Sequence, residues 1–154
     1  MTLLDIRQDD LSGDATRALI AYHQAGMLDD SPPGTSYALD LSGLQTSEIT
    51  VWSVWRAGDI AGVGALKMLG DGAAELKSMR THPDHLRQGV AAALLDYIIA
   101  EAKRRGLHTL SLETGTGPRF QAAETLYLKR GFRLGDTFGD YRPSPHNQFL
   151  HLKL

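Results

Sequence analysis

The stretch that decides the fold runs from Glu75 to Arg105 and reads ELKSMRTHPDHLRQGVAAALLDYIIAEAKRR. Pro83 cannot donate a hydrogen bond to a central sheet ladder, so we expect a strand to end just before it. From Val90 onward the apolar residues recur at helical spacing, and the basic run 103–105 followed by Gly106 is typical of a helix end. The stretch therefore predicts a strand, a short polar turn and a long amphipathic helix.

The turn between this strand and this helix has the properties of an anion site. The first N–H groups of a helix have no partners within the helix, and the helix dipole adds positive potential there. Gly89 has no Cβ, so a phosphate could approach the backbone closely. The turn matches neither the Walker phosphate loop nor G-x-G-x-x-G. On the residues alone, a phosphate-binding turn and an ordinary strand–helix turn both remain open.

The rest of the chain predicts one mixed sheet. Three strands, Ile49–Arg56, Ile60–Met68 and Ala73–Thr81, are separated by short turns rich in glycine and aspartate, which is typical of an antiparallel meander. The pattern before and after them predicts a strand over Leu3–Ile6, a helix over Leu11–Met27, a strand over His108–Glu113, a helix over Pro118–Arg130, and strands over Phe132–Leu134 and Asn147–Leu154. We therefore expect an α/β fold with an antiparallel N-terminal half and helices on both faces of the sheet.

Composition limits the class of protein. The 154 residues are enough for one domain, 1–154, and 42% hydrophobic with 22% charged residues is ordinary for a globular chain. The net charge of −2 argues against a nucleic-acid partner. No apolar run approaches the ~20 residues that span a bilayer, so no membrane partner is expected. The absence of cysteine excludes disulfides and thiolate catalysis, and the six histidines lack the spacing of metal ligands. With no apolar signal-peptide core in Met1–Asp10, we expect a cytoplasmic protein without a metal.

Two motifs resemble the GNAT superfamily of N-acetyltransferases. Residues 86–91, LRQGVA, resemble its acyl-CoA-binding loop Q/R-x-x-G-x-G/A, although Leu86 stands at the Gln/Arg position. Residues 123–132, AETLYLKRGF, resemble its segment A-x-x-L-Y-x-x-x-G-F, although Phe120 stands where the family often has asparagine. Both motifs occur in the family's order and on the expected elements, and phrases such as 112–115, LETG, resemble a bacterial acetyltransferase subgroup. The resemblance implies a single-domain GNAT-like fold and acetyl-CoA as cosubstrate.

The resemblance also implies which residues bind the cosubstrate. The backbone of Met79, Arg80 and Thr81 would pair with the pantetheine arm as an extra half-strand. The backbone amides of the turn and the first helical turn would bind the pyrophosphate; these residues are Arg87, Gln88, Gly89, Val90, Ala91 and Ala92. Because main-chain groups carry this binding, the side chains of the turn are free to vary.

Two residues are candidates for catalysis. Glu75 lies eleven positions before Leu86, where several GNAT enzymes have a glutamate that acts as general base, and a partly apolar cleft would raise the pKa of such a carboxylate. The alternative is that Glu75 faces solvent beside Lys77. Tyr127 matches the family's tyrosine that protonates the leaving thiolate; the alternative is a core aromatic residue.

The acceptor site is less defined by the sequence. Glu113 ends a strand beside the expected acyl site and either contacts the amine or caps the following turn. Tyr141 lies in a polar loop that could wall the acceptor pocket, and the family commonly places acceptor contacts in the loop Asp29–Tyr37. We expect acetyl transfer to a primary amine of a small molecule by direct attack, and a homodimer is possible. A protein N-terminal or lysine acetyltransferase and a non-catalytic acyl-CoA-binding module are the alternatives.

Overall fold

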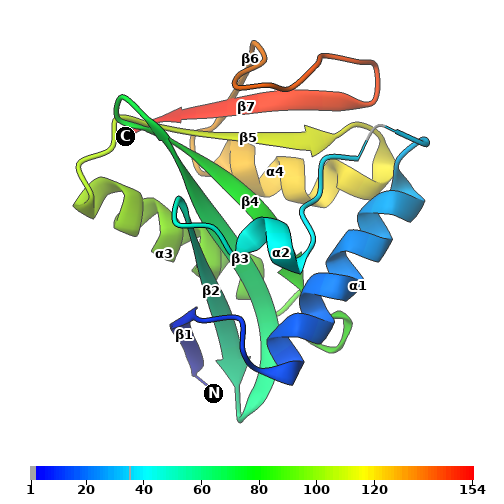
Figure 1. The fold of residues 1–154 in the computed structure, drawn as a ribbon, viewed down its shortest axis with the longest axis vertical. Coiled ribbons are helices and arrows are strands. Elements are labelled where there is room, and N and C mark those ends of the chain that lie inside the picture. Colours follow the sequence, from blue (N-terminus) through cyan, green and yellow to red (C-terminus); the bar gives the residue numbers. More distant parts are fainter. Residues whose placement is uncertain (1–2, 35) are drawn as a thin grey trace.

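A single seven-stranded sheet runs through the computed structural model, which describes residues 3–34 and 36–154 (Figure 1). The spatial order is β1-β2-β3-β4-β5-β7-β6, and every neighbouring pair is antiparallel except β4 and β5, which are parallel. The strands are β1 Leu4–Asp9, β2 Ile49–Arg56, β3 Asp59–Gly70, β4 Ala73–Thr81, β5 Thr109–Gly115, β6 Arg133–Gly135 and β7 Asn147–Lys153. The expected mixed α/β sheet with an antiparallel N-terminal half is confirmed.

The helices cover both faces of this sheet, as expected. They are α1 Asp14–Asp30, α2 Leu41–Leu44, α3 Val90–Arg104 and α4 Gln121–Lys129, with 3-10 turns η1 Pro83–His85 and η2 Pro118–Phe120. One apolar cluster lies between the sheet and the helices α3 and α4, and a second lies between the sheet and α1. Along β2, Trp52 and Val54 belong to the first cluster and Val51 to the second, as the alternation of a strand requires. We call the two sides the α3 face and the α1 face.

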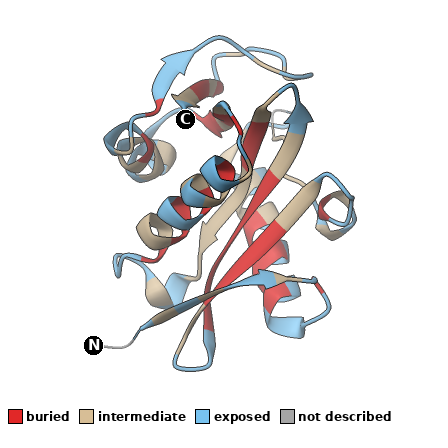
Figure 2. Ribbon diagram, turned by 90° about the vertical axis from the view of Figure 1, so that its left-hand side faces the viewer, coloured by how far each residue is buried: buried red, intermediate tan, exposed pale blue. Residues whose placement is uncertain are grey.

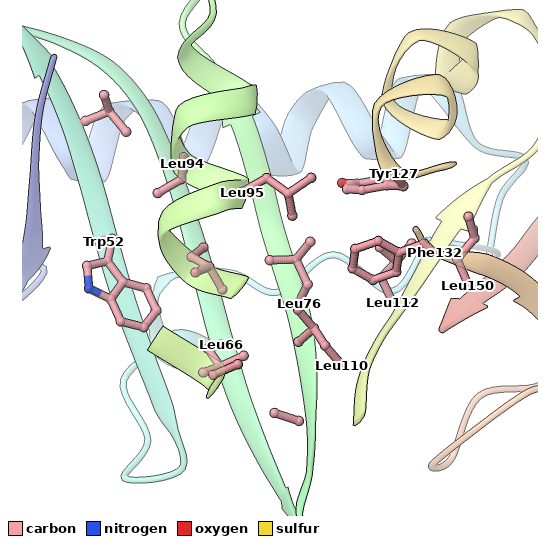
Figure 3. Packing of buried hydrophobic residues seen from close by; sticks show 14 of the residues in the cluster. Trp52, Leu66, Leu76, Leu94, Leu95, Leu110, Leu112, Tyr127, Phe132 and Leu150 are labelled. Atoms are coloured by element: carbon pink, nitrogen blue, oxygen red, sulfur yellow. The ribbon is translucent and has the colours of Figure 1, made fainter. Parts of the chain in front are cut away.

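The helix α3 is amphipathic, with one buried and one exposed side (Figure 2). Of the apolar positions that the periodicity indicates, five are buried, namely Val90, Leu94, Leu95, Ile98 and Ala102, while Ala91 and Ile99 are half-buried. Leu94 and Leu95 project toward the central strands (Figure 3), and burying each such side chain contributes about 1.5–3 kcal/mol. Gly64 on β3 makes the close approach possible, because a Cβ there would lie 3.0 Å from Leu94 Cδ2 and 3.3 Å from Ile98 Cδ1. The N-terminus of α3 is thereby fixed beside the end of β4.

Several element ends differ from the sequence expectation for local reasons. The first helix begins at Asp14 rather than Leu11, because the Asp9 carboxylate accepts a hydrogen bond from the Leu11 amide (2.8 Å) and Leu11 adopts φ 66°. The predicted helix over Pro118–Arg130 is divided into η2 and α4. Strand β1 continues to Asp9 and β5 to Gly115, because each remains paired with its neighbour that far. The ends of these strands depend on the neighbouring strands with which they pair, and the local sequence pattern does not show this pairing.

Among the described residues, no helix is both long and apolar enough to span a membrane. The cytoplasmic location stays a prediction. Of the segment Met1–Asp10, on which the absence of a signal-peptide core was judged, Met1 and Thr2 lie outside the described residues.

Candidate active site

The parallel strands β4 and β5 separate soon after they meet. Their pairing covers only Ala73–Glu75 on β4 and Thr109–Ser111 on β5, and beyond these residues the two strands diverge (Figure 1). On its other side β4 stays paired with β3, and β5 stays paired with β7. The sheet therefore contains a gap whose two edges carry backbone groups without a sheet partner among the described residues.

A cavity of about 570 Å³ occupies this gap and reaches both faces of the sheet. Val90, Leu94 and Tyr127 line it on the α3 face, while His23 and Glu75 line it on the α1 face. This volume is in the range of small-molecule and cofactor sites. A cavity open to both faces can admit two reactants from opposite sides of the sheet.

A bulge in β4 determines which side chains enter the cavity. Ser78 and Met79 together stand opposite Gly64, and Ser78 adopts φ 57°, a conformation that is uncommon outside glycine. Met79 packs into the cluster of the α3 face, and Arg80 contacts α1. Without the extra residue, strict alternation would turn Arg80 to the α3 face. The bulge therefore brings Arg80 to the same face as Glu75.

The turn before α3 has the geometry of an open anion site. Gly89 is the N-cap of α3 with φ 81°, a Cβ built on it would meet nothing within 4 Å, and no side chain caps the helix. Arg87 adopts φ 59°. Of the residues predicted to bind the cosubstrate, Arg87, Val90 and Ala91 line the cavity, as do Met79, Arg80 and Thr81, whereas Gln88, Gly89 and Ala92 are not part of its lining. The exposed helix start beside the cavity fits a pyrophosphate with its pantetheine arm in the cavity.

Glu75 is buried on the α1 face with 3% of its surface exposed, so the alternative that it faces solvent is wrong. Its carboxylate accepts hydrogen bonds from the Lys77 ammonium (Nζ to Oε2, 3.1 Å) and from the Tyr141 hydroxyl. The Lys77 ammonium also donates to the Tyr141 hydroxyl at 2.7 Å. The carboxylate thus lies among polar groups, in contrast to the expected apolar cleft. The two-residue spacing of Glu75 and Lys77 on one strand face is the only sequence signal of this arrangement.

Glu113 lies on the α1 face of β5 and lines the same cavity. Among the described residues, its carboxylate accepts one hydrogen bond, from the Asn147 side-chain amide at 3.3 Å. Burial raises the pKa of Glu113, while the Asn147 hydrogen bond and the Lys77 charge oppose this shift. Among the described residues, no backbone amide of the following turn donates to this carboxylate, so the geometry favours the cavity contact over the turn cap.

Tyr127 is a core aromatic residue that also borders the cavity, and its role as proton donor stays a prediction. Its ring is buried in the core and contacts Phe132 edge to face, with 5.7 Å between ring centroids. Burial raises the pKa of Tyr127 to about 12. The hydroxyl oxygen lies on the side of the ring toward Leu95 (Figure 3), and the residue lines the cavity from the α3 face. Within the described part of the chain, no group forms a hydrogen bond with this hydroxyl.

Contacts between distant segments narrow the cavity on the α1 face. The rings of Tyr37 and Tyr141 meet edge to face at 4.9 Å between centroids. Asp30 at the end of α1 and Arg119 in η2 form an ion pair at 2.6 Å. All four residues line the cavity. The loop Asp29–Tyr37 thus contributes to this half as the resemblance implies, although Thr35 lies outside the described residues.

Two residues of the site were not predicted from the sequence. Asn147 donates a hydrogen bond to Glu113, and His23 accepts a hydrogen bond from Arg80 (Nε to Nδ1, 2.9 Å). His23 and Arg80 are 57 residues apart in sequence, and no motif connects them. Only the packing of α1 on β4 reveals this pair.

The fold and the cavity define an acyltransferase of the GNAT class, and comparisons with known proteins support this. Residues 14–132 match the family model "Acetyltransferase (GNAT) family", so the chain belongs to that family. It is 51% identical to "Uncharacterized N-acetyltransferase YedL" of Escherichia coli (strain K12) over 99% of this chain and 96% of that protein. The protein is an acetyl-CoA-dependent N-acetyltransferase.

Solved structures share the fold over nearly the whole chain. One is the crystal structure of a protein from Klebsiella pneumoniae that is assigned to the acyl-CoA N-acyltransferases. It superposes with a TM-score of 0.83 at 29% sequence identity, and the match covers 99% of this chain and 98% of the Klebsiella chain. A Bacillus subtilis acetyltransferase, solved in complex with CoA, superposes with a TM-score of 0.69 at 21% identity over 99% of both chains. Within the described residues, no cluster of three or more histidine, aspartate or glutamate side chains could hold a metal ion.

Proposed function

We propose that residues 1–154 form a single domain that transfers the acetyl group of acetyl-CoA to the primary amine of a small molecule by direct attack. The cavity that crosses the sheet between β4 and β5 is the observation that carries the proposal. Its α3-face half adjoins the open helix start of α3, and its α1-face half contains Glu75, Lys77 and Glu113. Acetyl-CoA and an amine could therefore meet in the gap without a covalent enzyme intermediate.

The roles of the chain's own residues follow from their positions. Bound acetyl-CoA supplies the thioester, whose C–S bond breaks as the amine nitrogen forms the amide bond. Glu75, oriented by Lys77 and Tyr141, accepts the proton that the amine loses. Tyr127 is protonated at neutral pH, since burial raises its pKa to about 12, and its hydroxyl donates a proton to the leaving thiolate. The proton count balances, because one proton is accepted on the α1 face and one is donated from the α3 face.

The closure of the α1-face half supports a small acceptor over a polypeptide. A peptide substrate needs an open channel, whereas the Tyr37–Tyr141 contact and the Asp30–Arg119 ion pair join segments around this half. The non-catalytic alternative expects Glu75 and Tyr127 to face away from the acyl site, yet both line the cavity. The homodimer stays a prediction.

The proposal is tested by following thiol release from acetyl-CoA with a panel of small amines and a panel of short peptides. We expect amine-dependent release in the wild type, a large loss in Tyr127→Phe, and little release with peptides. Release with peptides alone would favour protein acetylation. Equal rates in wild type and Tyr127→Phe would remove the acid role from Tyr127.

A further inference from the structure

Arg80 is a half-buried arginine that lines the cavity. Its Nε donates to His23 Nδ1 at 2.9 Å, and its guanidinium carbon lies 5.6 Å from the centroid of the Tyr22 ring. The guanidinium also packs beside Gly26 on α1. No carboxylate within residues 3–34 and 36–154 forms an ion pair with it. Two of its three nitrogens are therefore left to interact with a ligand.

The neighbour of Arg80 does not neutralise its charge. Burial, together with the positive charge of Arg80, lowers the pKa of His23 to about 4. His23 is thus neutral at pH 7 and serves as a hydrogen-bond acceptor through Nδ1. A cation that is partly removed from water without a counter-ion is costly to maintain. An anion bound in the cavity would offset this cost.

The other cations that line the cavity differ from Arg80. Lys77 is paired with Glu75, and Arg119 is paired with Asp30. Arg87 is exposed and belongs to the turn before α3, where the cosubstrate's phosphates are expected. Arg80 is thus the cation of the α1-face half whose charge is unmatched among the described residues.

The α1-face half also contains two carboxylates that could receive an amine. Glu75 lies on the same strand and face as Arg80, and Glu113 lies across the gap on β5 with Asn147 as its one hydrogen-bond donor. Glu75 and Arg80 are five positions apart on β4, roughly 15 Å along a strand, and both line the cavity. This half therefore has a carboxylate end and a guanidinium end.

From this arrangement we propose that the acceptor is a small amine that also carries a carboxylate, with Arg80 binding the carboxylate and the amine lying near Glu75 and Glu113. The guanidinium fork suits a carboxylate because it can form two parallel hydrogen bonds with it. The inference rests on the proposed function, since it names the substrate class of the same site. It makes Arg80 a specificity-determining residue.

The test compares acceptors that differ only in the carboxylate. Amino acids of increasing amine-to-carboxylate separation are assayed beside their carboxamides and beside the amines that lack the group, by thiol release from acetyl-CoA. We expect the wild type to prefer at least one free acid over its carboxamide by roughly 10–100-fold in kcat/KM, the range of a charge-assisted hydrogen-bond pair. In Arg80→Gln this preference should fall to a few-fold, with the KM for acetyl-CoA unchanged.

Arg119→Gln is the matched control, because it removes a cavity-lining arginine that already has an acidic partner. This variant should change the rates with acids and carboxamides by the same factor. Equal wild-type rates for acids and carboxamides would overturn the inference and leave the proposed function standing, whereas no turnover with any amine would count against the proposed function itself. A rise in the KM for acetyl-CoA in Arg80→Gln would instead assign Arg80 to the cosubstrate. If Arg80→Gln does not bind acetyl-CoA, the preference of the wild type for free acids over carboxamides decides whether the acceptor carries a carboxylate.

Discussion

The two halves of the cavity are built in different ways. On the α3 face, one continuous stretch supplies the end of β4, the turn at Gly89 and the start of α3, and we propose that its backbone groups bind the cosubstrate. On the α1 face, side chains from α1, β4, β5 and the loop before β7 converge, among them His23, Glu75, Glu113 and Tyr141. A backbone site tolerates changes of side chain, whereas a side-chain site changes its ligand with each substitution. We therefore expect the first half to be common to many relatives and the second to set the acceptor.

The largest expected effect comes from Glu75 in the acceptor half. Glu75→Gln removes the proton acceptor, so kcat/KM for the amine should fall by about 10³-fold, within the ~10²–10⁴-fold range of general base catalysis. Binding of acetyl-CoA, measured by calorimetry, should not change. Glu101→Gln is the control, because Glu101, like Glu75, has a basic ion-pair partner but lies at the far end of α3. Weakened acetyl-CoA binding in Glu75→Gln would contradict the assignment of the acceptor and the cosubstrate to separate halves of the cavity.

Tyr127 lies on the α3 face, in the half of the cavity where we expect the cosubstrate. In this half it is a side chain on which we expect the reaction rate to depend. Tyr127→Phe should lower kcat by about 10²-fold through loss of the proton donor. Since burial raises the pKa of Tyr127 to about 12, the residue stays protonated across the accessible range, and the kcat of the wild type should not decline between pH 8 and pH 10. A decline with an apparent pKa near 10 that is absent in Tyr127→Phe would contradict the environment described for this residue.

The acceptor half should also make stability depend on pH, through His23. The pKa of His23 is lowered from 6.5 to about 4 in the folded chain, so the unfolded state binds the proton first as the pH falls. The contribution of His23 to the free energy of unfolding is fully present above pH 6.5 and is lost as the pH falls toward 4. The loss should reach about 2 kcal/mol at pH 5. Urea unfolding of wild type and His23→Gln at pH 7.5 and pH 5 measures it, and the same loss in both proteins would assign the effect to other groups.

The smallest expected effect tests the turn before α3. Gly89 has φ 81° in open space, so Gly89→Ala meets no steric contact but strains the backbone that presents the first N–H groups of α3. The KM for acetyl-CoA should rise about tenfold, equivalent to ~1.4 kcal/mol, with the KM for the amine unchanged. Gly106→Ala is the matched control, because Gly106 follows the other end of α3 with φ 76° and is equally open. Equal KM values for acetyl-CoA in both variants would show that strain at Gly89 does not reach the cosubstrate.

The sequence predicted the order of strands and helices along the chain and most of the buried side of α3, because these depend on short turns and on local periodicity. It also identified Glu75, Tyr127, Glu113 and Tyr141, all of which line the cavity. It did not predict the bulge at Ser78, since an extra residue in a strand leaves no fixed pattern. It also gave no indication that Lys77 and Tyr141 bind the Glu75 carboxylate together, because Tyr141 is 66 residues away from Glu75.

By itself, then, the sequence determined the reaction class through its resemblance to the GNAT family, because the motifs 86–91 and 123–132 that carry the resemblance are continuous in the chain. Only the tertiary structure decided what the acceptor half contains. The divergence of β4 from β5, the bulge that turns Arg80 toward α1, and the packing of α1 that keeps His23 neutral all depend on contacts between distant segments. Packing between distant segments determines which charged side chains form ion pairs within the protein and which can bind a charged ligand.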